Sequence, residues 1–296
     1  MTAIKAWRRW RAERANTRGN DALDRRALPE AASAYRRALD FDPGWSSPWF
    51  NLGIVHKWRR EWRPSLECNE KALALDPGNE GACWNLGIAA TALGEWAVAR
   101  RAWAHYGIDL PLGEGPIDAD LGLVPIRINP DEAPEVIWCR RLDPARSRIE
   151  GVPLPESGRR FHDLLLHDGE PRGSRMLGER EVPVFNEIMV LEASAAGTFE
   201  AYVTAASRED SEALEQAFVG ADCAAEDWSG NVRLICAQCS EGRPHEHERA
   251  ADTEVPWAPE RRIGIGALDA GRVDELLAAW QATGEGREVL SVERVL

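Results

Sequence analysis

The amino-acid sequence predicts a multidomain protein, with an all-α array of helical repeats first and an α+β region after it. The pair Leu52-Gly53 recurs as Leu86-Gly87, at an interval of about 34 residues. Such a period is the signature of a solenoid, in which each repeat stacks only on its neighbours. Further on, short apolar runs separated by proline and glycine are typical of strands and turns. Three prolines keep the same interval as the Leu-Gly pairs: Pro43, Pro77 and Pro111.

Alignment on these residues gives three repeats, at roughly residues 12–45, 46–79 and 80–113, after a leading segment of residues 1–11. In the second and third repeats an aromatic residue precedes the Leu-Gly pair, and small residues precede the proline. Small residues let paired helices approach closely. Because proline cannot continue a helix, we expect each proline to close the second helix of its repeat.

This pattern resembles the tetratricopeptide repeat (TPR), over about residues 12–113. The first repeat is weaker, since Arg18 stands where leucine is usual, but it keeps Gly19 and Tyr35. The resemblance implies an all-α TPR solenoid of three helix–turn–helix repeats that holds a partner protein or peptide. The residues that carry it in the later repeats are Trp49, Leu52, Gly53, Ala72 and Pro77, then Trp84, Leu86, Gly87, Ala99, Trp103 and Pro111.

In TPR arrays the first helices of the repeats line a concave groove. Asn51 and Asn85 occupy equivalent positions here, and an asparagine amide can both donate to and accept from a peptide backbone. The other interpretation is that these amides only tie neighbouring helices together. The resemblance makes the following residues candidates for partner binding: Asn16, Asn20, Phe50, Asn51, Ile54, Lys57, Trp84, Asn85, Ile88 and Thr91.

The TPR proteins that bind chaperones clamp a C-terminal carboxylate with lysine and arginine at set groove positions. The corresponding positions here hold Asn16, Gly81 and Asn85, so most of that clamp is missing. We therefore expect a partner that is recognised through apolar and amide contacts.

The leading segment, Ile4 to Arg14, reads as a short amphipathic helix with Ile4, Trp7 and Trp10 along one side. We expect a capping helix on the first repeat, because repeat arrays need their ends covered. The alternative is a surface helix that binds an anionic partner or a membrane.

The charge of the chain is unevenly distributed. The formal net charge is −13 and the pI about 5.1, yet residues 1–26 carry eight basic and three acidic residues, which leaves −18 for the remainder. An acidic chain repels phosphate, so we expect no nucleic-acid partner, and association through the Arg- and Trp-rich start is the weakest hypothesis.

Composition indicates a globular protein, with 44% apolar and 29% charged residues. No apolar signal segment or stretch of membrane-spanning length is present in the sequence. Of the six cysteines only Cys236 and Cys239 are closely spaced, which suits reduced thiols. The expected location is therefore cytoplasmic.

Residues 114–195 are expected to form a β-rich domain, for which no family is recognised. Residues 196–296 predict an α+β domain with a strand at 198–204, a helix at 208–219 and a strand at Asn231–Cys236, then a strand at 262–268, a helix at 271–281 and a strand at 288–292. That β-α-β-β-α-β order resembles the ferredoxin-like split fold. The strands expected in the β-rich domain are 122–128, 135–141, 161–167 and 184–192.

A metal-binding pattern lies in the loop at 236–260. Cys236 and Cys239 are followed by His245 and His247, a set that suits tetrahedral zinc. The spacing is not that of a zinc finger. We expect a structural zinc ion, while incidental cysteines beside solvated histidines, or a redox pair, remain open alternatives.

Other enzyme signals are weak, which favours a non-enzymatic role. The sequence holds no phosphate-binding P-loop, and Gly264-x-Gly266 lacks the third glycine of a dinucleotide site. His162 and His167 are five residues apart on a predicted strand, so they face opposite sides and are expected at the surface or in turns. The sequence therefore predicts an adaptor protein. The alternative is a metal-dependent hydrolase whose TPR array recruits the substrate.

Overall fold

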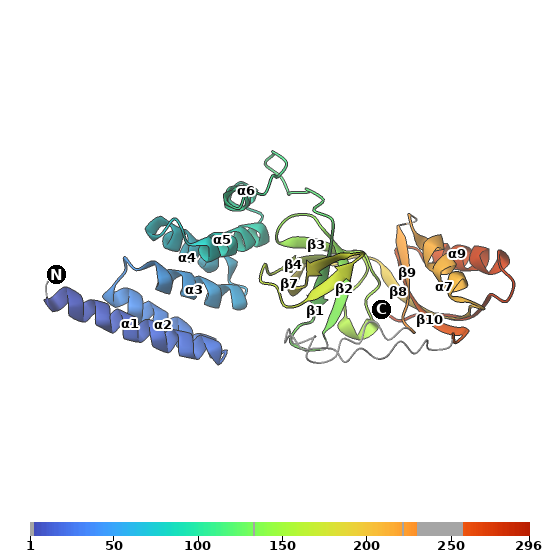
Figure 1. The fold of residues 1–296 in the computed structure, drawn as a ribbon, viewed down its shortest axis with the longest axis horizontal. Helices are drawn as coiled ribbons and strands as arrows, with labels where there is room; N and C mark the ends of the chain where they lie inside the picture. The colour runs from blue at the N-terminus through green and yellow to red at the C-terminus, as the bar shows by residue number, and fades with distance from the viewer. Residues whose placement is uncertain (1–2, 133, 221, 230–256) are drawn as a thin grey trace. The chain divides into compact units, whose positions relative to one another are not determined.

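The structure is a computed structural model that describes residues 3–132, 134–220, 222–229 and 257–296. The chain forms two compact units (Figure 1), Met1–Ala119 and Asp120–Leu296, named here the helical unit and the β-rich unit. Among the described helices, none is both long and apolar enough to cross a membrane.

The helical unit contains three consecutive helix–turn–helix pairs, in the order that the repeat predicts (Figure 1). The regularly spaced prolines separate the pairs, because Pro43 and Pro77 follow the ends of α2 and α4. The helices are α1 (Ala3–Asp24), α2 (Leu28–Phe41), α3 (Ser46–Trp58), α4 (Trp62–Leu75), α5 (Glu80–Leu93) and α6 (Trp96–His105).

Two boundaries differ from the prediction. Residues 3–11 are not a separate capping helix, because they continue without a break into the first repeat as one 22-residue helix, α1. Pro111 does not close α6, which ends at His105. Gly107 ends that helix instead, since its φ of 68° is a left-handed conformation that glycine adopts without strain.

One packing contact is repeated in all three pairs. A glycine in the first helix lies against a side chain of the second helix, and a Cβ atom on that glycine would lie less than 3.0 Å from it. The glycines and their partners each recur at the interval of the repeat, so the sequence period corresponds to a repeated close crossing of helices. The pairs are Gly19 with Tyr35, Gly53 with Asn69, and Gly87 with Trp103.

The β-rich unit begins with a closed five-stranded barrel, in the strand order β1-β2-β3-β4-β7. β1 and β7 close it through a parallel pairing, whereas the other neighbours are antiparallel. The sequence predicts four of these strands and does not mark β3, because the residues RSRI are not an apolar run. The strands are β1 (Leu123–Ile128), β2 (Glu135–Arg141), β3 (Arg146–Ile149), β4 (Leu164–His167) and β7 (Phe185–Glu192), with a 3-10 turn, η1 (Pro155–Ser157), and a separate hairpin of β5 (Ser174–Leu177) and β6 (Arg180–Pro183).

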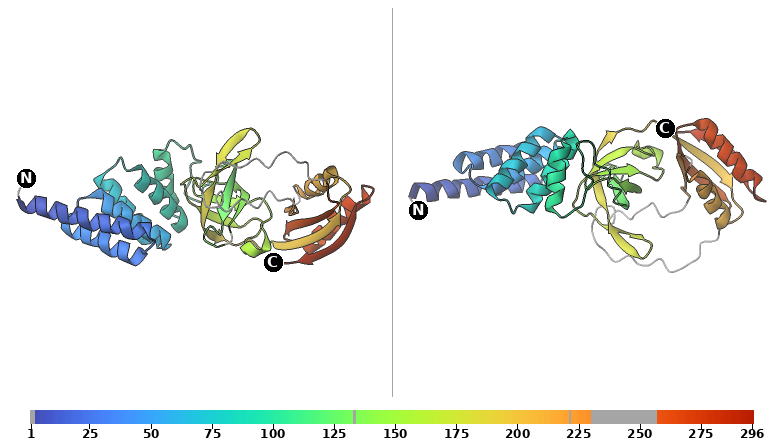
Figure 2. Two further views of the ribbon diagram at one scale, coloured as in Figure 1. Left: turned by 60° about the horizontal axis from the view of Figure 1, so that its bottom comes forward. Right: turned by 90° about the horizontal axis from the view of Figure 1, so that it is seen from above.

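A four-stranded antiparallel sheet follows, in the order β11-β8-β10-β9. Two helices cover one face (Figure 2), and their apolar side chains form one core with those of the strands. The elements are β8 (Gly197–Thr204), α7 (Arg208–Phe218), β9 (Cys223–Asp227), β10 (Glu260–Ala267), α9 (Ala270–Ala282) and β11 (Glu288–Arg294).

The second strand of this sheet differs from the prediction. The sequence predicts it at Asn231–Cys236, but the strand that pairs with β10 is β9, at Cys223–Asp227. Its sequence, CAAED, contains no β-branched or aromatic residue, so strand propensity does not mark it. Residues 231–236 lie outside the described residues.

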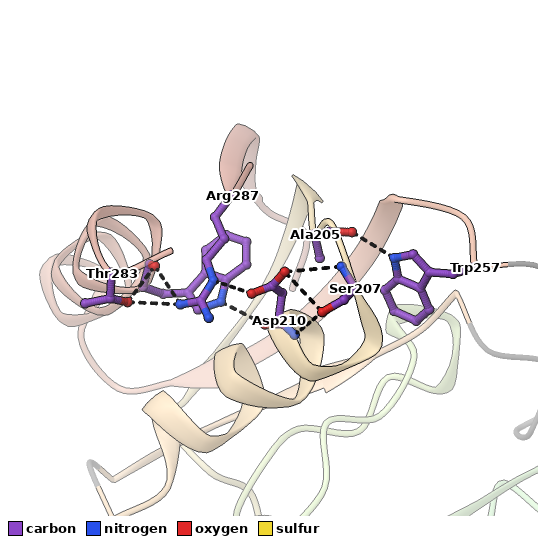
Figure 3. A network of polar contacts seen from close by, with 7 residues as sticks. Ala205, Ser207, Asp210, Trp257, Thr283 and Arg287 are labelled. Atoms are coloured by element: carbon purple, nitrogen blue, oxygen red, sulfur yellow. Dashed lines mark hydrogen bonds and ion pairs between the residues drawn. The ribbon is translucent and has the colours of Figure 1, made fainter. Parts of the chain in front are cut away.

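A polar network joins α7 and α9, the two helices that cover the sheet (Figure 3). Ser207 and Asp210 form a reciprocal capping box at the start of α7. Arg287 donates to Asp210 Oδ1 at 2.8 Å and to the carbonyl oxygen of Trp280 at 3.1 Å. Its hydrogen bond lowers the pKa of Asp210, so the ionised carboxylate holds the first turn of α7 against the last turn of α9.

Gly264 and Gly266 have a packing role. On β10 they alternate with Ile263 and Ile265, which face the helices, so the glycines face the opposite side of the sheet. A Cβ on Gly264 would collide with the indole of Trp228. A Cβ on Gly266 would collide with Phe161, so close packing accounts for both glycines.

Candidate partner-binding site

A ladder of polar side chains connects the first helices of the three repeats. The Asn51 amide, on α3, donates to Asn16 Oδ1 at 3.2 Å and to Asn20 Oδ1 at 3.1 Å, both on α1. The hydroxyl of Tyr35 also donates to Asn20 Oδ1, at 3.0 Å. Asn51 therefore ties the second repeat to the first.

The next step of the ladder joins α3 to α5. Lys57 Nζ donates to Asn85 Oδ1 at 2.9 Å. Asn85 is 6% exposed and Lys57 7% exposed, so this pair is part of the interior. We name Asn16, Asn20, Asn51, Lys57 and Asn85 the polar ladder. Its asparagines tie neighbouring helices together, in agreement with the second of the two interpretations above.

Several of the candidate residues in or beside the ladder remain accessible. Asn20 is exposed, and Phe50, Asn51 and Ile54 are half-buried. These four side chains come from α1 and α3, and the third repeat adds the half-buried Trp84 of α5.

The third repeat contributes less than predicted. Ile88 is 0% exposed and Thr91 is 2% exposed, so neither can line a groove. The reason is that α5 is apolar on most of its circumference, and such a helix is buried on most sides. Trp84 packs on Trp103 and Tyr106 within its own repeat, with ring centroids 5.0 Å apart in both pairs.

The position at which a clamping cation is expected is sterically filled. A Cβ on Gly81 would lie 2.9 Å from the ring of Phe50, which comes from the preceding repeat. The two other clamp positions hold Asn16 and Asn85, which are 8% and 6% exposed. This part of the array therefore offers amides and an aromatic ring, and no positive charge at these three positions.

Among the described residues, neither the cysteines nor the metal-ligating side chains form a reactive cluster. The four cysteines that the structure describes are free and buried, and burial raises the pKa of the Cys68 thiol to about 11. Within the same residues, no group of three or more His, Cys, Asp and Glu side chains could hold a metal ion. The predicted metal ligands, Cys236, Cys239, His245 and His247, lie outside the described residues.

The expectation that His167 lies at the surface is wrong. It is 0% exposed at the end of β4 and stacks on Phe185, with ring centroids 5.6 Å apart. Its Nδ1 donates to the carbonyl oxygen of Asp168 at 2.9 Å. The β4–β7 pairing places it inside, whereas His162 occupies a turn with a φ of 69°.

The helix pairs can be compared with solved structures. The helical part is a TPR array. It is similar to the TPR domain of Arabidopsis OM64, at 18% identity and a TM-score of 0.32, with 33% of this chain and 81% of that chain covered. The second TPR of Spaghetti (RPAP3), bound to the HSP90 peptide SRMEEVD, gives 18% identity and a TM-score of 0.34, with 35% and 94% covered. The TPR2B domain of yeast Sti1, in complex with pHsp70, is 21% identical, with a TM-score of 0.31. The match covers 32% of this chain and 76% of that chain.

These likenesses concern the fold of about a third of the chain. No protein-family model matches the sequence, and a search of curated proteins gave no match.

Proposed function

We propose that this protein is an adaptor whose TPR array binds a segment of a partner protein along the polar ladder. The observation that carries the proposal is the grouping of Asn20, which is exposed, with the half-buried Asn51, Phe50 and Ile54. Amides can pair with a peptide backbone, and the aromatic and aliphatic side chains can bury an apolar residue of the partner.

The expected partner differs in chemistry from the peptides of the similar structures. Peptide SRMEEVD is bound by the TPR domains of Spaghetti (RPAP3), and its sequence contains three acidic residues. Since this array holds Asn16, Gly81 and Asn85 where a clamp would place cations, we infer an internal segment with apolar residues as the partner.

The experiment is an affinity capture from native lysate with the wild type and an Asn20→Ala/Asn51→Ala variant. Loss of one enriched protein in this variant supports the proposal. The matched control is Glu67→Gln/Glu70→Gln, at two exposed positions of α4, which should capture the same protein as the wild type. Thermal unfolding of all three proteins separates lost contact from lost structure. A capture that is equal in all three contradicts groove binding.

For the β-rich unit we propose a ferredoxin-like fold of the final sheet and a second contact surface that zinc stabilises. The strand order supports the first part, and the Cys236, Cys239, His245 and His247 pattern is the only basis for the second. Metal content of the purified chain, compared with a Cys236→Ser/Cys239→Ser variant, tests the zinc. A wild type free of zinc would refute it.

The hydrolase alternative depends on the same four ligands. A catalytic zinc keeps one position open for water, whereas a structural zinc has four protein ligands. The spectrum of the cobalt-substituted protein distinguishes the two, because saturation by four protein ligands excludes the hydrolase.

A further inference from the structure

Helix α1 has a second face on the side away from the polar ladder. Ile4, Trp7, Arg11, Arg14 and Arg18 follow one another at alternating steps of three and four residues, so they form a single row along the helix. By the same helical periodicity, the ladder residues of α1 lie on its opposite side. We name this row, together with Arg37 and Phe41 of α2 beside it, the basic face.

The basic face contains a cavity of about 460 Å³ between α1 and α2. On α2 the lining positions also recur every three or four residues, on the side away from Tyr35 and the core it shares with α3. The lining carries four arginines and one carboxylate, which is a local charge of +3. The lining residues are Arg11, Arg14, Ala15, Arg18, Glu30, Ser33, Ala34, Arg37 and Phe41.

The arginines of this cavity have no carboxylate partner among the described residues. Arg11 lies over the rings of Trp7 and Phe41, at 5.5 and 5.2 Å, and Arg14 lies 4.9 Å from the ring of Trp10. Arg14, Arg18 and Arg37 are exposed.

The neighbouring arginines of the same helix show the contrast. Arg8 donates to the carbonyl oxygens of Asp40 and Phe41 at the end of α2, where the helix dipole favours a cation. Arg9 pairs with Glu13 at 2.9 Å and with Asp42 at 3.0 Å. These two therefore fasten α1 to α2, whereas the guanidinium groups of the cavity are available to an anion.

We propose that the basic face binds an acidic segment of a partner protein, at a site separate from the polar ladder. Carboxylates of that segment pair with Arg14, Arg18 and Arg37, and an apolar residue of it packs on Trp7, which is 53% exposed, and Ile4, which is 73% exposed. Charge complementarity selects such a segment, because the cavity lining carries a local charge of +3.

A peptide fits this face better than a membrane surface. The site is a cavity between two helices, while a bilayer requires a broad apolar face on a helix. On α1 arginines stand on several sides of the helix, with Arg8 and Arg9 turned toward α2, so polar and apolar faces are not separated.

The test is fluorescence anisotropy of a labelled, glutamate-rich peptide with one phenylalanine, titrated with the full chain. We expect saturable binding that weakens as salt is added. Arg14→Glu/Arg18→Glu should weaken it on the order of tenfold or more. The control, Arg36→Glu/Arg101→Glu, makes the same change of net charge at exposed positions outside the cavity and should bind as the wild type.

Three results would overturn the proposal. The first is equal loss of peptide binding in both double variants, which would show a general charge effect. The second is binding of the wild type to phosphatidylserine vesicles, lost in Arg14→Glu/Arg18→Glu, without peptide binding. The third is a concentration-dependent self-association, measured by sedimentation velocity, that only this variant abolishes; the occupant would then be a second copy of the chain.

Discussion

The ammonium group of Lys57 donates a hydrogen bond of 2.9 Å to the side-chain oxygen of Asn85, and both side chains are almost completely buried. The bond joins the first helix of the second repeat to that of the third. A buried ammonium group needs such an acceptor, because removal from water disfavours an unpaired charge. The contact between these repeats therefore includes a specific hydrogen bond as well as apolar packing.

Replacing Asn85 by leucine should destabilise the helical unit by about 2 kcal/mol, because Lys57 loses one of its hydrogen-bond acceptors while its charge stays buried. The double variant Lys57→Met/Asn85→Leu should recover part of that loss, since it removes the charge as well. Urea unfolding followed by circular dichroism measures both. Equal losses in the single and double variants would show that the pair is not coupled.

The glycine contact of the third repeat makes a second prediction. Gly87→Ala should destabilise the array by about 2 kcal/mol, because its methyl group collides with Trp103, which is 0% exposed and cannot move aside. The control is Gly44→Ala, whose nearest neighbour would be Asp42 at 3.6 Å, and its stability should change by less than about 0.5 kcal/mol. Thermal unfolding is the measurement.

The peptide SRMEEVD should not bind along the polar ladder. The clamp positions hold Asn16, Gly81 and Asn85, and Phe50 occupies the space beside Gly81. Fluorescence anisotropy with the labelled peptide should show no saturation in the micromolar range in the Arg14→Glu/Arg18→Glu variant, whose basic face cannot take the carboxylates of the peptide. The second TPR of Spaghetti (RPAP3) serves as the positive control. Saturable micromolar binding would mean that other cations replace the clamp.

The buried His167 predicts a dependence of stability on pH. Burial, and then the nearby Arg141, lower the pKa of His167 from 6.5 to about 3. In the unfolded chain the imidazole takes up a proton below pH 6.5, whereas in the folded chain it stays neutral down to about pH 3. The stability of the β-rich unit should therefore be highest above pH 6.5 and fall as the pH is lowered, by about 1.4 kcal/mol per pH unit from this group.

A His167→Leu variant checks this assignment, because leucine does not titrate. Its free energy of unfolding, measured with urea between pH 7 and pH 5, should decrease less steeply than that of the wild type. Identical slopes would show that other groups cause the dependence.

The sequence by itself determined the TPR array. Its constant period follows from geometry, since Gly19, Gly53 and Gly87 must each admit one side chain from the second helix of the same repeat. It also indicated most strands of the β-rich unit, where apolar and β-branched residues are frequent. Such signals are visible in a single amino-acid sequence, without knowledge of the tertiary contacts.

Only the tertiary structure decided which predicted site residues are accessible. Asn16, Asn85 and Ile88 have the right spacing for a groove, yet neighbouring helices bury them. Burial depends on what packs against a residue, and spacing along one helix does not contain that information. The same holds for His167, which a closed barrel surrounds, and for the pairing of β9 with β10.

The basic face shows most clearly what the sequence determines and what the tertiary structure adds. The excess of arginine near the start of the chain is visible in the sequence, but its composition does not distinguish paired from unpaired charges. The packing of α1 on α2 assigns Arg8 and Arg9 to Asp40, Phe41 and Asp42 and leaves Arg14 and Arg18 beside a cavity. The sequence determined the amount of charge, and the contact between two helices determined which part of it is available to a partner, because a charge that is already paired has little left to offer.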